Sequence, residues 1–206
     1  MKNLKRLMVM ILSAIIIGFG IAFFVDAQLG ADSMTTFEQG ISITFNIDLA
    51  LCSIIANGLF VILTLFVKPK ALTIPTLVYP LFISLGIKIA NLLIKADLTD
   101  LLVRVIFMLL GLITIGLGIG LGSNCNCGNN PYDGFVICLS EKLKTQFRYV
   151  RMVIDIILLI VGILLKGSYG VGTIVAIVLQ GSIAQWFIEN FNKWEMLNKF
   201  LEVENK

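Results

Sequence analysis

The chain has 206 residues, of which 58% are hydrophobic and 14% charged, and it contains no histidine. Soluble domains carry about 25% charged residues, so this composition excludes a soluble globular fold and indicates a membrane protein. The net charge of +3 is small and the basic residues are dispersed, which argues against a nucleic-acid partner. We expect a single membrane domain over residues 1–206.

Six apolar stretches follow one another along the chain, each close to the roughly 20 helical residues that cross a hydrocarbon core. We expect transmembrane helices at Leu7–Phe24, Leu49–Val67, Leu72–Ile94, Leu101–Leu121, Val150–Leu165 and Val171–Ile188. Residues 192–206 would then form a short tail. The alternative for the first stretch is a cleaved signal peptide ending near Ala27, but its apolar run exceeds the usual signal core of about 7–15 residues.

Basic residues predict the orientation of these helices. Most of the 16 lysines and arginines fall on the side of the amino terminus, and the exceptions lie close to span ends, at Lys88, Lys95, Arg104 and Lys166. Long basic side chains near a span end can reach the lipid headgroups. Because basic loops stay in the cytoplasm, both termini are expected there.

The first three spans resemble the last three at a constant offset of 98 residues, which divides the chain into repeats over residues 7–94 and 101–191. Several glycines fall on glycines: Gly18 on Gly116, Gly20 on Gly118, and Gly30 on Gly128. Since each repeat holds an odd number of spans, the second must enter the bilayer inverted, as in many solute transporters. The expected fold is all-α, with two inverted three-helix repeats.

A long polar connection follows the first span of each repeat, at Val25–Asp48 and Gly122–Tyr149. In the second connection, Asn130 can cap a helix that has Pro131 at its first position. The offset predicts a matching helix that starts at Asp32 or Ser33. Each helix is too short to cross the bilayer, so it is either interfacial or re-entrant.

Small residues four positions apart predict close helix packing. They are Ala14, Gly18 and Ala22 in the first span, and Gly116 and Gly120 in the fourth. Such stripes let membrane helices approach closely, and we expect the two stripes to face one another across the axis that relates the repeats. The alternative is that glycine is simply common in membrane helices.

Polar residues within the spans are the first candidates for a solute site. Asp155 lies about five residues into the fifth span, and the offset places Asn57 at the equivalent depth of the second span. A carboxylate near mid-membrane costs about 2.5 kcal/mol or more, so it normally faces a cavity or a partner. The alternatives are a structural hydrogen bond between helices, or a position near the interface beside Arg151.

Two further equivalent pairs lie at span ends and connections: Asp26 with Asn124, and Asp32 with Asn130. If the connections fold inward, the helix starts near Asp32 and Asn130 would present free backbone N–H groups to an anionic or polar solute. Gln180 in the sixth span is a weaker candidate. Solvated loops, helix caps and interhelical packing are the alternatives for these residues.

Catalytic and metal chemistry have little support in the sequence. Cys125 and Cys127 form a Cys-x-Cys pair, but without histidine or a second nearby pair they lack the four ligands of a structural zinc site. No phosphate-binding loop, nucleophile elbow or paired-carboxylate motif is present. We expect no metal, no cofactor and no enzymatic activity.

Three short elements resemble those of a known family: Asn130-Pro131-Tyr132-Asp133 after Gly128, Gly40-Ile41-Ser42 after Leu29-Gly30, and Gly170-Val171-Gly172-Thr173. They are similar to the YczE/YitT-like bacterial membrane proteins, most closely to the YczE branch. The resemblance implies a bacterial inner-membrane protein without a settled activity, and it adds Asp133 to the candidate site. The first repeat departs from the pattern, with Ser33-Met34-Thr35 at the equivalent of Pro131-Tyr132-Asp133.

These features predict a small-solute transporter that works by alternating access around a polar site near the membrane midplane. A substrate-binding subunit of a larger uptake system, and a non-transporting accessory or scaffold protein, are the alternatives. The expected partners are the lipid bilayer and a small solute. A homodimer or a membrane partner protein is also left open.

Overall fold

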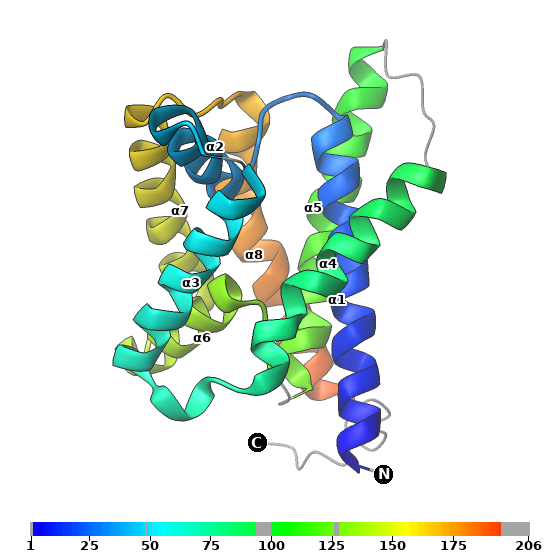
Figure 1. The fold of residues 1–206 in the computed structure, drawn as a ribbon. Helices are drawn as coiled ribbons and strands as arrows, with labels where there is room; N and C mark the ends of the chain where they lie inside the picture. Colours follow the sequence, from blue (N-terminus) through cyan, green and yellow to red (C-terminus); the bar gives the residue numbers. More distant parts are fainter. Residues whose placement is uncertain (1, 48, 94–99, 126–127, 195–206) are drawn as a thin grey trace.

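The computed structural model describes residues 2–47, 49–93, 100–125 and 128–194, and these form eight α-helices and one 3-10 turn (Figure 1). In chain order the elements are α1 (Lys2–Asp26), α2 (Ser33–Phe45), α3 (Leu49–Val67), η1 (Pro69–Ala71), α4 (Ile74–Leu93), α5 (Leu101–Asn124), α6 (Pro131–Leu143), α7 (Phe147–Leu164) and α8 (Val171–Lys193). The expected all-helical fold is confirmed. Ile94, Cys127 and the tail from residue 195 lie outside the described residues.

Four of the described helices are long and apolar enough to cross a membrane: Leu4–Asp26, Ile74–Leu93, Leu101–Asn124 and Val171–Lys193. The other two expected spans are also helical, as α3 and α7. Within α3, the apolar segment Leu51–Val67 is shorter. Helix α7 carries Arg148, Arg151 and Asp155, which lower its hydropathy. Several apolar helices therefore indicate membrane insertion. That the chain crosses the membrane six times stays a prediction.

Large apolar side chains cover the outside of the bundle. Phe66 is 79% exposed and Ile74 is 81% exposed, and many other leucines and isoleucines on α3, α4, α5 and α7 are also open. A soluble protein rarely exposes so much contiguous apolar surface, because water penalises it. Lipid tails are the solvent that fits this exterior.

The helices form two groups. The long helix α1 lies between α4 and α5, and α5 also packs against α8. In the second group the short helix α2 packs against α7 and α3, while the short helix α6 packs against α3 and α7. Figure 1 shows α2, α3, α6 and α7 on one side and α1, α4 and α5 on the other, with contacts between α7 and α8 joining the groups.

Local conformation recurs at the 98-residue offset. The short helices each have 13 residues and begin at Ser33 and Pro131, as the sequence predicts. Each ends in a left-handed cap, at Asn46 with φ 52° and at Lys144 with φ 53°. Packing recurs too, because α1 contacts α4 as α5 contacts α8, and α2 contacts α7 as α6 contacts α3.

The small-residue stripes pack differently from the expectation. Gly18 lies against the backbone of α4, while Gly116 and Gly120 lie against backbone and side-chain atoms of α8. The close contact between α1 and α5 uses Gly20 and Gly111 instead, where a Cβ on Gly20 would lie 2.9 Å from the Gly111 carbonyl oxygen. Positions two apart are about 200° apart around a helix, so Gly18 and Gly20 serve opposite faces. The expectation that the two stripes face one another is therefore wrong.

Candidate functional site

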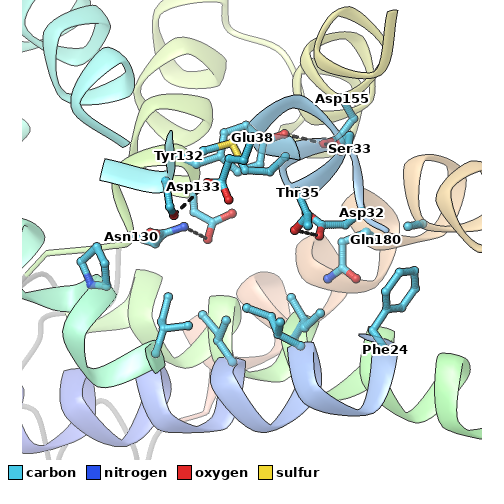
Figure 2. Close-up of a pocket in the computed structure, with 18 of the residues that line it drawn as sticks. Phe24, Asp32, Ser33, Thr35, Glu38, Asn130, Tyr132, Asp133, Asp155 and Gln180 are labelled. Carbon is cyan, nitrogen blue, oxygen red and sulfur yellow. Dashed lines mark hydrogen bonds between the residues drawn. The ribbon is translucent and has the colours of Figure 1, made fainter. Parts of the chain in front are cut away.

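A cavity of about 240 Å³ lies between the two helix groups, and all eight α-helices contribute to its wall (Figure 2). Its apolar side comes mainly from α1, α4, α5 and α8: Ile17, Ile21, Phe24, Ile83, Ile87, Leu112, Ile115, Ala176 and Ile177. Its polar side comes mainly from α2, α3, α6 and α7: Asp32, Ser33, Thr35, Glu38, Ser53, Asn57, Asn130, Tyr132, Asp133, Arg151 and Asp155. Residues distant in sequence therefore converge on one space.

Asp155 is held by hydroxyl groups from two different helices. The residue is only 4% exposed, and its carboxylate accepts hydrogen bonds from the hydroxyls of Ser33 on α2 and Tyr132 on α6, the latter at 2.7 Å. The guanidinium of Arg151, one turn earlier on α7, lies 3.5 Å from its second oxygen. Buried carboxylates persist when they are paired and hydrogen-bonded, and this one has both forms of support.

Arg151 is buried between α6 and α7. It donates a hydrogen bond to the carboxylate of Asp133, and its guanidinium lies 5.0 Å from the ring centre of Tyr132 and 5.8 Å from that of Phe147. Arginine suits such a position because its planar group bonds carboxylates and stacks on aromatic rings. The ion pair places one positive charge at the wall of the cavity.

Two carboxylates, one on α2 and one at its N-cap position, face the same cavity without a cationic neighbour in the described wall. Glu38 is buried and accepts a hydrogen bond of 3.0 Å from the hydroxyl of Ser53. Asp32 precedes α2 and accepts a hydrogen bond from the hydroxyl of Thr35. Among the described residues that line the cavity, Arg151 is the one cationic side chain. The described wall therefore holds four carboxyl groups against one cationic group, and burial together with the nearby charge of Asp32 raises the pKa of Glu38 to about 7.

Gln180 is the polar residue that α8 brings to the cavity. It is 4% exposed, and neither its amide nitrogen nor its amide oxygen has a hydrogen-bond partner within the described part of the chain. Figure 2 shows its side chain directed into the cavity next to Asp32. Buried polar groups are nearly always hydrogen-bonded, so this amide requires an explanation.

The structure brings most of the predicted site residues together. Six of them line the cavity: Asp32, Asn57, Asn130, Asp133, Asp155 and Gln180. Asp26 does not line it, and neither does Asn124, whose buried amide donates hydrogen bonds to the carbonyls of Gly120 and Ile188 at 2.9 and 3.4 Å. These two residues lie at the ends of α1 and α5, beyond the cavity.

The predicted helix caps take a different geometry. Asn130 and Asp32 occupy the expected N-cap positions, but neither side chain makes a capping hydrogen bond. The amide of Asn130 instead donates to the carboxylate of Asp133 at 3.4 Å. Since Asp133 already places a negative charge in the first turn of α6, that helix end is less suited to an anion than expected.

Sequence reasoning missed Glu38 as a site residue and placed Arg151 near the membrane interface. The signal for Glu38 was available at the 98-residue offset, where its equivalent is the fully buried Val136. A carboxylate at a position whose equivalent is buried and apolar indicates a special environment. The spacing of Arg151 one turn before Asp155 is a local signal for an ion pair, but it does not show the main partner of Arg151, because Asp133 comes from another helix.

Hydrogen bonds join two connections at one end of the bundle. There the α1–α2 connection and α2 meet residues 165–173, and we call this the sealed end. Its bonds join Thr36 to the Ser168 carbonyl at 2.9 Å, Thr44 to the Leu165 carbonyl at 2.8 Å, and the Gly172 amide to the Leu29 carbonyl at 2.8 Å. Arg104 of α5 donates to the carbonyl of Ala27 at 2.8 Å, although we expected it to reach the headgroups.

The opposite end holds a second cavity of about 280 Å³. It lies among η1 and the first turns of α4 and α6, and Asn129 and Pro131 line it while Asn130 between them lines the central cavity. Lys68 donates a hydrogen bond of 2.6 Å to Glu141 there, and this bond raises the pKa of Lys68. The two ends of the bundle therefore differ.

Comparison with known sequences places the chain in a family. A family model described as a family of unknown function, DUF6198, matches residues 4–189. The chain belongs to the DUF6198 family. The description of the matching family does not mention YczE or YitT, so the similarity to the YczE/YitT-like proteins stays a resemblance.

Two bacterial relatives extend the similarity over most of the chain. An uncharacterised protein of Haemophilus influenzae is 28% identical over 184 residues, which cover 89% of this chain and 84% of the relative. The uncharacterised protein YyaS of Bacillus subtilis is 21% identical over 176 residues, covering 84% of this chain and 88% of the relative. No solved structure matches.

Proposed function

We propose that this DUF6198 protein is a small-solute transporter of the bacterial cytoplasmic membrane that works by alternating access. The observation that carries the proposal is the central cavity, because its polar wall is assembled from both halves of the chain. Solute sites of inverted-repeat transporters lie at the interface between the repeats. The solute would pass unchanged, so no chemical step is proposed.

We infer that the two halves of the chain form an inverted repeat, which would permit this mechanism. Helices α1 to α4 match α5 to α8 in order, and the short helices start 98 residues apart. In Figure 1 the helices α1 and α5 run in opposite directions, and α2 and α6 lie near opposite ends of the bundle. Two halves related in this way can exchange conformations, which would open the cavity first at one end and then at the other.

The unequal ends support a conformation that opens on one side. At the sealed end, hydrogen bonds join α2 to residues 165–168, whereas the opposite end holds the second cavity. The start of α1 and the end of α8 lie at that opposite end (Figure 1). With both termini in the cytoplasm, the cavity would open inward and the sealed end would face outward.

The test is accessibility of the cavity from both sides of the membrane. Ser84 lines the cavity on α4, so Ser84→Cys in a protein whose four native cysteines are replaced provides a label site. A transporter should react with an impermeant maleimide in intact cells and also in inside-out vesicles. Leu81→Cys, which is exposed on the same helix but does not line the cavity, is the control for labelling outside the cavity.

A cross-link provides the decisive arm of this experiment. The side chains of Gln39 and Ser168 meet across the sealed end, so a Gln39→Cys, Ser168→Cys pair can be bridged by a short bifunctional thiol reagent. Bridging should abolish labelling from the outside and keep labelling from the inside. Access from one side only before bridging would favour a substrate-binding subunit, and no access from either side would favour a scaffold.

A further inference from the structure

We propose that the central cavity binds a small organic cation that carries an ammonium group, with Asp32 and Glu38 as its counter-charges and Gln180 as its hydrogen-bond partner. The proposal deepens the proposed function by naming the class of solute, and it rests on the central cavity being the transport site. It combines three independent features of the cavity wall: charge, an unsatisfied amide and an apolar face.

The carboxyl groups of the cavity wall that have no cationic partner lie on α2 and at its N-cap position. Arg151 forms an ion pair with Asp133 of α6 and also approaches Asp155 of α7. The cationic group of the wall is therefore paired with carboxylates of these two helices. Asp32 and Glu38 accept hydrogen bonds from hydroxyl groups but contact no cationic side chain among the lining residues. Neighbouring carboxylates in a desolvated site repel one another, and a bound cation relieves that repulsion.

Gln180 provides the second observation. Both polar atoms of its buried amide lack a partner in the described chain, and the amide points into the cavity beside Asp32. An amide offers one acceptor and two donor hydrogens. Its oxygen can accept from an ammonium N–H, and its nitrogen can donate to a second polar group on the same solute. A ligand placed between Asp32 and Gln180 would therefore satisfy this amide.

The apolar wall decides between an organic cation and an inorganic one. The same cavity is lined by Ile17, Ile83, Ile87 and Ile115, which can contact a carbon skeleton. A hydrated inorganic ion gains nothing from such a surface, whereas buried methylene groups do. The volume of about 240 Å³ is below the range of about 300–1,000 Å³ typical of drug-sized ligands, so the solute is small.

An anionic solute fits this wall less well. We expected the helix starts near Asp32 and Asn130 to attract anions, but Asp32 and Asp133 already place carboxylates at both helix starts. A second negative charge there would meet repulsion at short range. The geometry therefore favours the opposite charge.

The experiment measures thermal unfolding of the purified full-length protein in detergent at constant ionic strength. The probes are alkylammonium chlorides of one to six carbons, with alcohols and carboxylates of the same length as matched comparisons. The ammonium series should raise the unfolding temperature in a saturable manner, with an optimum chain length set by the cavity. Equal or larger stabilisation by the alcohols or the carboxylates would overturn the proposal.

Variants assign the effect to the proposed residues. Glu38→Gln and Asp32→Asn should each raise the dissociation constant of the best ammonium probe at least tenfold. Glu189→Gln, on an exposed part of α8, removes the same charge outside the cavity and should leave that constant unchanged. If all three carboxylate variants behave alike, the ammonium effect is a surface effect and the proposal is wrong.

Gln180→Leu separates a binding role from a structural one. Removing an unsatisfied buried amide should make the ligand-free protein as stable as the original or more stable, because leucine has no unpaired polar group. The same variant should raise the dissociation constant of the ammonium probe at least fivefold. Unchanged ammonium binding in a folded Gln180→Leu protein would refute the role of this amide.

Failure of the organic-cation proposal can be distinguished from failure of the transport proposal. Ammonium binding with cavity labelling from only one side would keep the assigned ligand and reject alternating access. Cavity labelling from both sides without ammonium stabilisation would keep the transporter and reject the organic cation.

Discussion

Arg151 connects α6 and α7 through two carboxylates that it contacts unequally. It donates a hydrogen bond to Asp133, whereas its closest approach to Asp155 is 3.5 Å. Asp155 also has the hydroxyls of Ser33 and Tyr132, so its charge depends less on the arginine. The two aspartates therefore have different roles in the same cluster, and their substitution should have different consequences.

We expect Asp133→Asn to destabilise the protein more than Asp155→Asn. The first change removes the main partner of a buried guanidinium, which costs about 3–5 kcal/mol in buried ion pairs. The second leaves that pair in place and weakens hydrogen bonds, at about 1–3 kcal/mol. Unfolding of the purified variants in detergent measures both values. A larger loss for Asp155→Asn would contradict this division of roles.

The polar site was only partly predictable from single residues. Asp155 was identified because a carboxylate inside an apolar span is costly wherever the helix lies. Glu38 was not, because in a polar connection a glutamate is expected to be solvated. Its burial depends on the packing of α2 against α3 and α7, which no local pattern encodes. Arg151 was misplaced for the same reason, since Asp133 approaches it from another helix.

At the scale of elements, the α1–α2 connection depends on one glycine. Gly30 has φ 125°, a conformation that residues with a Cβ rarely adopt, and an added Cβ would lie 2.6 Å from the backbone nitrogen of Gly170. The connection therefore passes directly over the start of α8. This contact closes the sealed end through backbone groups.

Gly30→Ala should destabilise the protein by at least about 1–3 kcal/mol, because strain at φ and a steric clash add. Gly58→Ala on α3 is the matched control. A Cβ there meets no atom within 4 Å, so alanine should be neutral or stabilising by up to about 1 kcal/mol. Unfolding temperatures of the two variants test the pair. Equal effects would show that the sealed end does not rely on this contact.

Element boundaries were predictable where sequence signals are local. The starts of α2 and α6 followed from Pro131, its cap position and the 98-residue offset, and the structure places them at Ser33 and Pro131. The faces of helices were less predictable. The spacing of Gly18 with Ala14 and Ala22 shows that a stripe exists, but it does not show that α4 covers Gly18.

At the scale of the whole molecule, the short helix of each half of the chain packs against a helix of the other half. Helix α2 of the first half packs on α7 of the second, and α6 of the second packs on α3 of the first. Neither half therefore encloses the cavity alone. Under the proposed mechanism, movement at one end is coupled to the other through these shared contacts, because packed interfaces have few alternative arrangements.

Thr173 tests this coupling. Its hydroxyl donates to the Ala31 carbonyl and accepts from the Gly170 amide at 3.1 Å, so Thr173→Val removes both bonds from the sealed end while keeping side-chain shape. A net loss of about 1 kcal/mol corresponds to about a fivefold shift in a two-state equilibrium. Labelling of Ser84→Cys from the outside should therefore accelerate about fivefold, and labelling from the inside should not increase. Thr114→Val is the control, since that hydroxyl bonds to Leu110 within its own helix. If both valine variants change outside labelling equally, the hydrogen bonds of Thr173 do not set the equilibrium between the two ends.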